Sequence, residues 1–192
     1  MSLFITFEGP EGSGKTTQMH LLAAALREDG YDVLATREPG GTAIGDLVRA
    51  ILLDPARTEM APNTEFLLFS AARAQHVAEK IRPHLARGGI VLSDRYADSS
   101  LAYQGYGHEM DLDALRAISR FATGGLAPDL TCCFDLPVEV GLRRKAKGSG
   151  DAWNRMEQKE QAYHERVRSG YLAMAAQEPA RWLVVDATRT LE

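Results

Sequence analysis

The chain has 192 residues, of which 45% are apolar and 25% charged, a composition ordinary for a globular protein with one sizeable core. The formal net charge of −4 argues against general binding of nucleic acid, so an anion site has to concentrate its basic residues locally. No apolar run approaches the roughly 18 residues of a membrane span, and the N-terminal residues lack a secretory leader. We therefore expect a cytoplasmic protein without membrane contact, in which Cys132 and Cys133 are buried and reduced.

The first predicted element is a strand over residues 3–7, which leads into GPEGSGKT at residues 9–16. This motif matches the phosphate-binding loop G-x-x-x-x-G-K-[ST] at every fixed position, and a helix predicted over residues 16–26 completes its required context. Backbone N–H groups and the helix N-terminus attract phosphate, Lys15 reaches the β- and γ-phosphates, and the Thr16 hydroxyl suits Mg²⁺. The residues expected around the nucleotide phosphates are Gly9, Pro10, Glu11, Gly12, Ser13, Gly14, Lys15, Thr16 and Thr17.

Strands and helices alternate along the whole chain, which predicts one doubly wound parallel sheet in a single domain over residues 1–192. The later strands are nearly continuous apolar runs, as expected for strands covered on both faces. The predicted strands are 3–7, 32–36, 89–93, 130–135 and 182–186. The predicted helices are 16–26, 42–53, 63–86, 111–123 and 154–176.

The second strand ends in the loop REPGGT at residues 37–42. Its glycines permit a turn with positive φ, and Thr42 can cap the next helix, which carries Arg49. Ligands of open α/β sheets bind at the carboxyl ends of strands, and a plain connector would not need this much glycine and charge. We expect a ligand contact here.

The helix predicted over residues 63–86 places Phe69 and Arg73 four residues apart, on one face. A guanidinium beside an aromatic ring can recognise a planar base, although Phe69 could also be an ordinary core residue. We expect His76 to lie on the helix surface.

The third strand ends in SDRY at residues 93–96. Asp94 resembles the second acidic signature of phosphate-binding-loop proteins, which orders Mg²⁺, and Arg95 can direct its donors at a phosphate. A structural ion pair of Asp94 is the alternative. Hydroxyl, phenol and amide groups follow, which suit a polar ring and a sugar, at Ser99, Ser100, Tyr103 and Gln104.

A basic segment follows the fourth strand, with cations at Arg143, Arg144, Lys145 and Lys147 before Gly148-Ser149-Gly150. A solvated charged face is one interpretation, but beside a phosphate-binding loop the pattern favours a mobile lid over about residues 143–155. The chain ends as if a further helix were beginning at Thr190.

These features together indicate a small phosphotransferase with a second anionic substrate. The loop alone predicts only a bound nucleoside triphosphate. The chain lacks the base-reading N-K-x-D motif of GTPases and the additional domains of remodelling ATPases. The surplus cations expected to meet a second phosphate are Arg37, Arg49, Arg73 and Arg95.

Five segments together resemble the thymidylate kinase family: FEGPEGSGKTT (7–17), REPGGT (37–42), SDRY (93–96), SSLAYQG (99–105) and NRME (154–157). The resemblance implies a P-loop nucleoside monophosphate kinase fold, with a five-stranded parallel sheet flanked by helices, and a homodimer. It also implies Mg²⁺-dependent transfer of the γ-phosphoryl group of ATP to dTMP, giving ADP and dTDP for dTTP synthesis. The alternatives are another pyrimidine nucleotide or deoxynucleoside kinase of this fold, and a nucleotide-binding regulator without catalysis.

The resemblance also implies residue roles, with Phe69 stacking on thymine, Arg73 and Gln104 at its edge, and Tyr103 at the sugar. Gly12 stands where some family members have an arginine, so this chain resembles the bacterial type. The catalytic cations of that type come from the lid, and Lys145 is one candidate for such a cation. The implied dTMP site is Glu11, Arg37, Glu38, Pro39, Arg49, Phe69, Arg73, Arg95, Ser99, Ser100, Tyr103 and Gln104. The implied catalytic residues are Lys15, Arg95, Arg144, Lys147 and Arg155, with Thr16 and Asp94 at Mg²⁺. The implied adenine site is Arg143, Asp186 and Ala187.

Overall fold

Five strands form one parallel sheet in the order β2-β3-β1-β4-β5, in a computed structural model that describes residues 2–147, 154–156 and 158–189. All five predicted strands are present, each within one residue of its predicted bounds. The strands are β1 Leu3–Glu8, β2 Val33–Arg37, β3 Ile90–Asp94, β4 Leu130–Asp135 and β5 Trp182–Asp186.

The strand order creates a crevice at the carboxyl ends of β1 and β3. The connection leaving β1 crosses to β2 on one side, whereas the connection leaving β3 crosses to β4 on the other. Ligands of such sheets bind where neighbouring connections diverge in this way. The register pairs Phe7 with Asp94, so the loops after β1 and β3 begin side by side.

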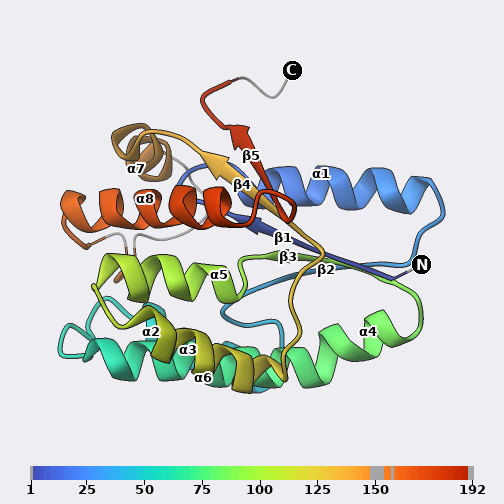
Figure 1. The fold of residues 1–192 in the computed structure, drawn as a ribbon, viewed down its shortest axis with the longest axis horizontal. Coiled ribbons are helices and arrows are strands. Elements are labelled where there is room, and N and C mark those ends of the chain that lie inside the picture. Colours follow the sequence, from blue (N-terminus) through green and yellow to red (C-terminus); the bar gives the residue numbers. More distant parts are fainter. Residues whose placement is uncertain (1, 148–153, 157, 190–192) are drawn as a thin grey trace.

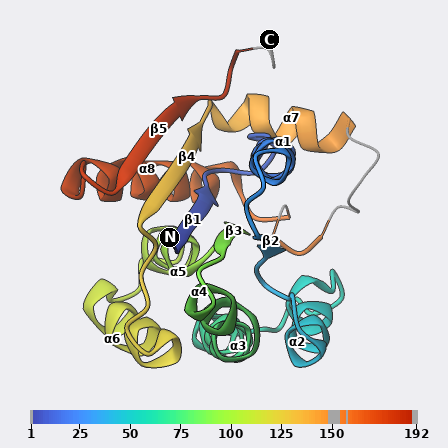
Figure 2. The ribbon, with the colours of Figure 1, turned by 90° about the vertical axis from the view of Figure 1, so that its right-hand side faces the viewer.

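Helices cover both faces of the sheet (Figures 1 and 2). On one face α1 (Lys15–Glu28) packs Met19 and Ala23 against apolar side chains of β1, β3 and β4. On the other face α8 (Gln161–Gln177) and the continuous helical segment α5 (Ala97–Ser100) with η2 (Leu101–Gly107) cover β4 and β5. None of the helices in the described ranges is long and apolar enough to cross a membrane.

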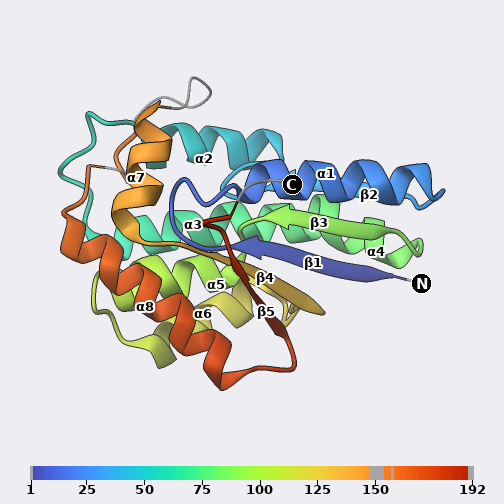
Figure 3. The same ribbon diagram turned by 90° about the horizontal axis from the view of Figure 1, so that it is seen from above.

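Three further helices, α2 (Ala43–Leu53), α3 (Pro62–His76) and α6 (Leu112–Thr123), lie next to one another on the side away from α1 (Figure 2). The predicted cap of α2 is confirmed, because Thr42 Oγ1 accepts a hydrogen bond from the Gly45 N–H at 2.9 Å. Helix α7 (Val138–Lys147) follows β4 and lies beyond the carboxyl ends of β1 and β3 (Figure 3). The predicted basic segment therefore begins on a helix.

The long helix predicted over residues 63–86 is continuous, but it changes geometry in its middle. A π-helical stretch, η1 (Val77–Ile81), joins α3 to α4 (Arg82–Ala86). The surface position predicted for His76 is wrong, because its side chain is 0% exposed. Its ring packs under the loop after β2, a contact between distant segments that helical periodicity does not reveal.

The helix predicted from Asn154 is also wrong at its start, because α8 begins only at Gln161. Tyr163, Val167 and Tyr171 are buried on α8 as predicted. Residues 154–156 are not helical, and their N–H groups bond elsewhere: that of Met156 donates to the Asn154 side chain at 2.8 Å and that of Arg155 to the Leu53 carbonyl oxygen at 3.4 Å. Residues 148–153 of the predicted lid and the predicted helix start at 190–192 lie outside the described residues.

Candidate active site

The loop after β1 is shaped by three glycines with positive φ: Gly9 at 128°, Gly12 at 68° and Gly14 at 85°. A Cβ atom on Gly9 would lie 2.4 Å from the Phe134 carbonyl oxygen of β4, so only glycine fits against the sheet there. Gly14 precedes α1, and no side chain caps the first N–H groups of this helix. The loop therefore presents backbone donors and a helix N-terminus to an anion.

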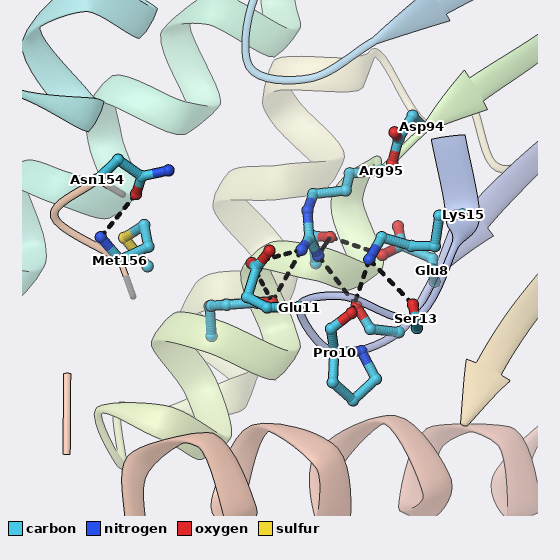
Figure 4. Close-up of polar contacts among 12 residues, drawn as sticks. Glu8, Pro10, Glu11, Ser13, Lys15, Asp94, Arg95, Asn154 and Met156 are labelled. Carbon is cyan, nitrogen blue, oxygen red and sulfur yellow. Dashed lines mark hydrogen bonds and ion pairs between the residues drawn. The ribbon is translucent and has the colours of Figure 1, made fainter. Parts of the chain in front are cut away.

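Lys15 folds back over this loop. Its Nζ donates to the Pro10 carbonyl oxygen at 2.8 Å and to Ser13 Oγ at 3.2 Å (Figure 4). Burial and the nearby Arg95 lower the pKa of Lys15 to about 8, although Glu11 opposes this shift. The ammonium group is thus held at the loop with little solvation, where a phosphate would favour its charged form.

Asp94 ends β3 beside the same loop, and the Thr16 hydroxyl donates to its carboxylate. Among the described residues no group of three His, Cys, Asp or Glu side chains could enclose a metal ion. A hydroxyl and one carboxylate fit Mg²⁺, which takes few protein ligands and completes its shell with substrate phosphates and water.

Arg95 follows Asp94 with a φ of 73°, in the left-handed region that few non-glycine residues adopt. Its guanidinium lies between Glu11 and Lys15 (Figure 4). One nitrogen, Nη1, donates to the Gly9 carbonyl oxygen, Ser99 Oγ and the Tyr171 hydroxyl at 3.1–3.3 Å. The other, Nη2, donates to Glu11 Oε1 at 2.7 Å and to the Tyr103 hydroxyl at 2.9 Å. Arg95 therefore joins the loop after β1 to η2 and α8.

Glu11 carries a negative charge into the centre of this cluster. Its Oε1 accepts hydrogen bonds from Arg95 Nη2 and, at 2.8 Å, from the Tyr103 hydroxyl. Burial alone would raise the pKa of Glu11, but Arg95 and Lys15 outweigh it and lower the pKa to about 2. One carboxylate of the phosphate-binding loop thus links that loop to Arg95 after β3 and to Tyr103 of η2.

Behind Arg95 lies a residue that sequence analysis missed, Glu8, the last residue of β1. Its side chain is buried and accepts from the Tyr96 N–H, Ser99 Oγ and the Tyr171 hydroxyl at 2.6–2.9 Å. Burial and the nearby Asp98 raise the pKa of Glu8 to about 7, against the opposing effect of Arg95. A charged residue ending an otherwise uncharged strand was the one signal that could have identified it.

The raised pKa of Glu8 predicts a pH-dependent stability. Because the folded protein holds this proton more tightly than the unfolded chain, the stabilisation is complete below about pH 4.5 and falls as pH rises through 7. Glu8→Gln keeps the shape of the side chain but does not titrate, so it should not lose stability through Glu8 as the wild type does. The free energy of unfolding of the variant, compared with that of the wild type at the same pH, should therefore rise by about 2 kcal/mol between pH 5 and pH 8. Urea unfolding at both pH values measures this. A relative change no larger than that of the exposed control Glu28→Gln would contradict it.

The end of β2 and the loop after it are fixed to α3 by a chain of hydrogen bonds. Thr36 Oγ1 lies 2.7 Å from His76 Nε2, and His76 Nδ1 lies 3.0 Å from Glu38 Oε1. The other oxygen, Glu38 Oε2, accepts from Arg73 Nε at 2.7 Å. Arg73 also donates to Ser100 Oγ and to the Tyr96 carbonyl oxygen, each at 3.0 Å. Three of its five N–H groups therefore hold α3, the loop and α5 together.

A single cleft of about 760 Å³ collects most of the predicted site. It is lined by these predicted residues: Glu11, Gly12, Ser13, Gly14, Lys15, Thr16, Thr17, Arg37, Glu38, Pro39, Arg49, Phe69, Asp94, Arg95, Ser99, Ser100, Tyr103 and Gln104. Other predicted residues do not line it: Gly9, Pro10, Arg73, Arg143, Arg144, Lys147, Arg155, Asp186 and Ala187. The cleft is large enough for the reacting parts of two ligands.

The predicted lid cations occupy different places. Lys145 lines the cleft, whereas Lys147 is exposed on the last turn of α7. Arg144 donates to the carbonyl oxygens of Ala187 at 2.7 Å and Thr188 at 3.3 Å, so this arginine contacts the loop after β5. Arg155 is buried in an ion pair with Glu65.

Gly12 has a packing role that explains why no larger side chain stands there. A Cβ atom on Gly12 would lie 2.1 Å from the Gly141 carbonyl oxygen of α7, and one on Gly141 would lie 2.2 Å from the Glu11 carbonyl oxygen. The two glycines let α7 approach the phosphate-binding loop. A parallel sheet of this order, with that loop after its central strand and a basic cleft facing it, defines a P-loop kinase of the nucleoside monophosphate class.

The chain belongs to the thymidylate kinase family, whose model matches residues 7–192. The thymidylate kinase of Roseiflexus castenholzii is 57% identical over 203 residues, covering 100% of this chain and 89% of that protein. That of Thermomicrobium roseum is 58% identical over 188 residues, covering 98% and 88%. The crystal structure of the Ehrlichia chaffeensis enzyme superposes with a TM-score of 0.80 at 35% identity, covering 96% of this chain and 92% of that one.

Proposed function

We propose that this phosphotransferase moves the γ-phosphoryl group of ATP to dTMP, giving ADP and dTDP for dTTP synthesis. The observation that carries this is the single cleft in which the phosphate-binding loop faces Arg95, Phe69 and Gln104. One wall suits a triphosphate, and the other offers a cation, an aromatic ring and an amide to a pyrimidine nucleotide. Both substrates can therefore meet head to head.

On the ATP side, the loop and Lys15 would hold the β- and γ-phosphates. Thr16 and Asp94 would hold Mg²⁺, partly through water, and the ion would supply neutralisation of phosphate charge. Arg143 and Arg144, with Asp186 and Ala187, would border the adenine. The cations that α7 can contribute are Arg143, Arg144, Lys145 and Lys147.

On the acceptor side, Arg95 would bind the dTMP phosphate, assisted by Arg37 and Arg49. Phe69 would stack on thymine, while Arg73, with two N–H groups beyond its three protein contacts, and Gln104 would meet the edge of the ring. The remaining contacts come from the loop after β2, from α5 with η2, and from the phosphate-binding loop. They are Glu38, Pro39, Ser99, Ser100, Tyr103 at the sugar and Glu11 at its 3′-hydroxyl.

The reaction places few chemical demands on the protein. The dTMP phosphate is already a nucleophile, so no strong general base is required. Holding two phosphates in line and neutralising their charge supplies most of the catalysis. Closure of the cleft by the lid would exclude water and suppress ATP hydrolysis.

A coupled ADP-release assay with dTMP, dUMP, UMP and thymidine tests this proposal. We expect dTMP to have the largest kcat/KM, about tenfold or more above dUMP, because a pocket that fits the 5-methyl group gains about that much. Turnover of thymidine without turnover of dTMP would identify a nucleoside kinase instead. Tight ATP binding without turnover of any acceptor would identify a regulator.

We also propose that the chain is a cytoplasmic homodimer. The two buried, free cysteines suit a reducing compartment.

Large apolar side chains are exposed together on the neighbouring helices α2, α3 and α6, with Leu47 71% and Phe121 89% exposed. Apolar exposure of this extent on adjacent helices is typical of a protein interface. The six residues are Ile44, Leu47, Ile51, Leu67, Ile118 and Phe121.

Charge on this surface should separate the subunits. We expect wild-type protein to have a dimeric mass by sedimentation at micromolar concentration, and Leu47→Glu with Phe121→Glu to have a monomeric mass, because both carboxylates would be buried unpaired. Leu21→Glu on α1, where Leu21 is 54% exposed, is the matched control and should stay dimeric. A monomeric wild type would contradict the proposal.

A further inference from the structure

Glu65 of α3 joins three distant segments beside the cleft. Its side chain is 1% exposed. Oε1 accepts from Gln104 Nε2 of η2 at 2.7 Å, and Oε2 lies 2.6 Å from Arg155 Nη2. His108 Nε2 lies 3.3 Å from Oε1. Burial alone would raise the pKa of Glu65, but His108, Gln104 and Arg155 outweigh it and lower the pKa to about 2, so the carboxylate is charged.

Arg155 also contacts the end of α2. Its side chain is 5% exposed, Nε donates to the Leu52 carbonyl oxygen at 2.9 Å, and its backbone N–H donates to the Leu53 carbonyl oxygen at 3.4 Å. Arg155 does not line the cleft, although Asn154 and Met156 on either side of it do. Figure 4 shows these two neighbours across from Arg95.

We propose that Arg155 and Glu65 are positioning residues that clamp the acceptor wall of the cleft, and that Arg155 does not act as a cation on the transferring phosphoryl group. The clamp holds the segment of Asn154 and Met156 against the end of α2, and it orients Gln104 through the second carboxylate oxygen. This inference rests on the proposed function, because Gln104 is assigned there to thymine. Removing either partner leaves a buried charge uncompensated, so each depends on the other.

A double-mutant cycle of Glu65→Gln, Arg155→Met and the double variant distinguishes the two roles. If the pair is a clamp, each single change should raise the KM for dTMP about tenfold or more, while kcat and the KM for ATP stay within about threefold of the wild type. The KM for dTMP of the double variant should then be no higher than that of either single variant. Arg155→Lys should restore part of the dTMP affinity. A phosphate-contacting Arg155 predicts instead a kcat loss of about 10²-fold or more in Arg155→Met, normal kcat in Glu65→Gln, and multiplying effects in the double variant.

Arg57→Met is the matched control, because Arg57 forms an exposed ion pair with Asp54 just after α2 and should leave all constants unchanged. Urea unfolding of the same variants gives a second cycle, in which additive single effects would overturn the clamp. If Arg155→Met does not fold, Arg155→Lys takes its place in both cycles. Absence of dTMP turnover by the wild type would refute the proposed function alone, since coupling of Arg155 to Glu65 is still measured by unfolding.

Discussion

Lys15→Met is expected to lower kcat/KM for dTMP phosphorylation by about 10³-fold, because it removes the one cation within the phosphate-binding loop. Methionine preserves most of the volume of the buried side chain. Within the part of the chain that the structure describes, the Nζ atom donates to Pro10 and Ser13 of its own loop and holds no other element in place, so the fold should survive. Steady-state kinetics with a thermal unfolding check measures the effect.

The pH dependence of ATP binding gives this prediction a second readout. The pKa of Lys15 is lowered to about 8 in the free protein, so ATP affinity of the wild type should weaken as pH rises past 8, where binding has to recharge the amine. Lys15→Met should lose this dependence. A rate close to that of the wild type, or an identical pH profile, would contradict the role given to Lys15.

Arg95→Ala is expected to cost about 10²–10³-fold in kcat/KM for dTMP, while ATP hydrolysis without acceptor changes little. The guanidinium reaches both the loop and the acceptor wall, and alanine would leave the half-buried Glu11 carboxylate without its closest cation. Binding of dTMP, measured by calorimetry, should fall in parallel.

Arg95→Lys separates geometry from charge. Lysine keeps the charge but cannot reproduce a fork that contacts Glu11 and Tyr171 with different nitrogens, so it should recover only a minor part of the loss. Recovery to near the wild-type rate would mean that Arg95 acts as a point charge. An equal loss of ATP hydrolysis and of dTMP phosphorylation would place its effect outside the acceptor site.

Local patterns were sufficient for much of the fold. Strands covered on both faces are short apolar runs, and the glycines of the loop at residues 9–16 follow from the backbone shape that phosphate requires. Thr42 predicted the start of α2, because the hydrogen bond of its N-cap closes within four residues. Each of these features depends on neighbours in the chain.

The errors arose where distant segments meet. His76 has the sequence context of a helix surface, but the loop after β2 covers it, and Gly41 approaches so closely that a Cβ atom would lie 3.0 Å from His76 Nε2. The start predicted at Asn154 failed because Arg155 is anchored to α2 and α3 instead of to its own helix. Nothing in the spacing of residues 154–157 records those partners.

The sequence by itself therefore determined the parallel sheet, the phosphate-binding loop and the family, because these depend on short-range pattern and on motifs at fixed spacing. Only the tertiary structure decided which cations line the cleft. Lys145 lines it, whereas Arg144 is turned to the loop after β5 and Arg155 is paired with Glu65. A charged side chain is placed by the partners that compensate its burial, and those partners lie far away in the chain.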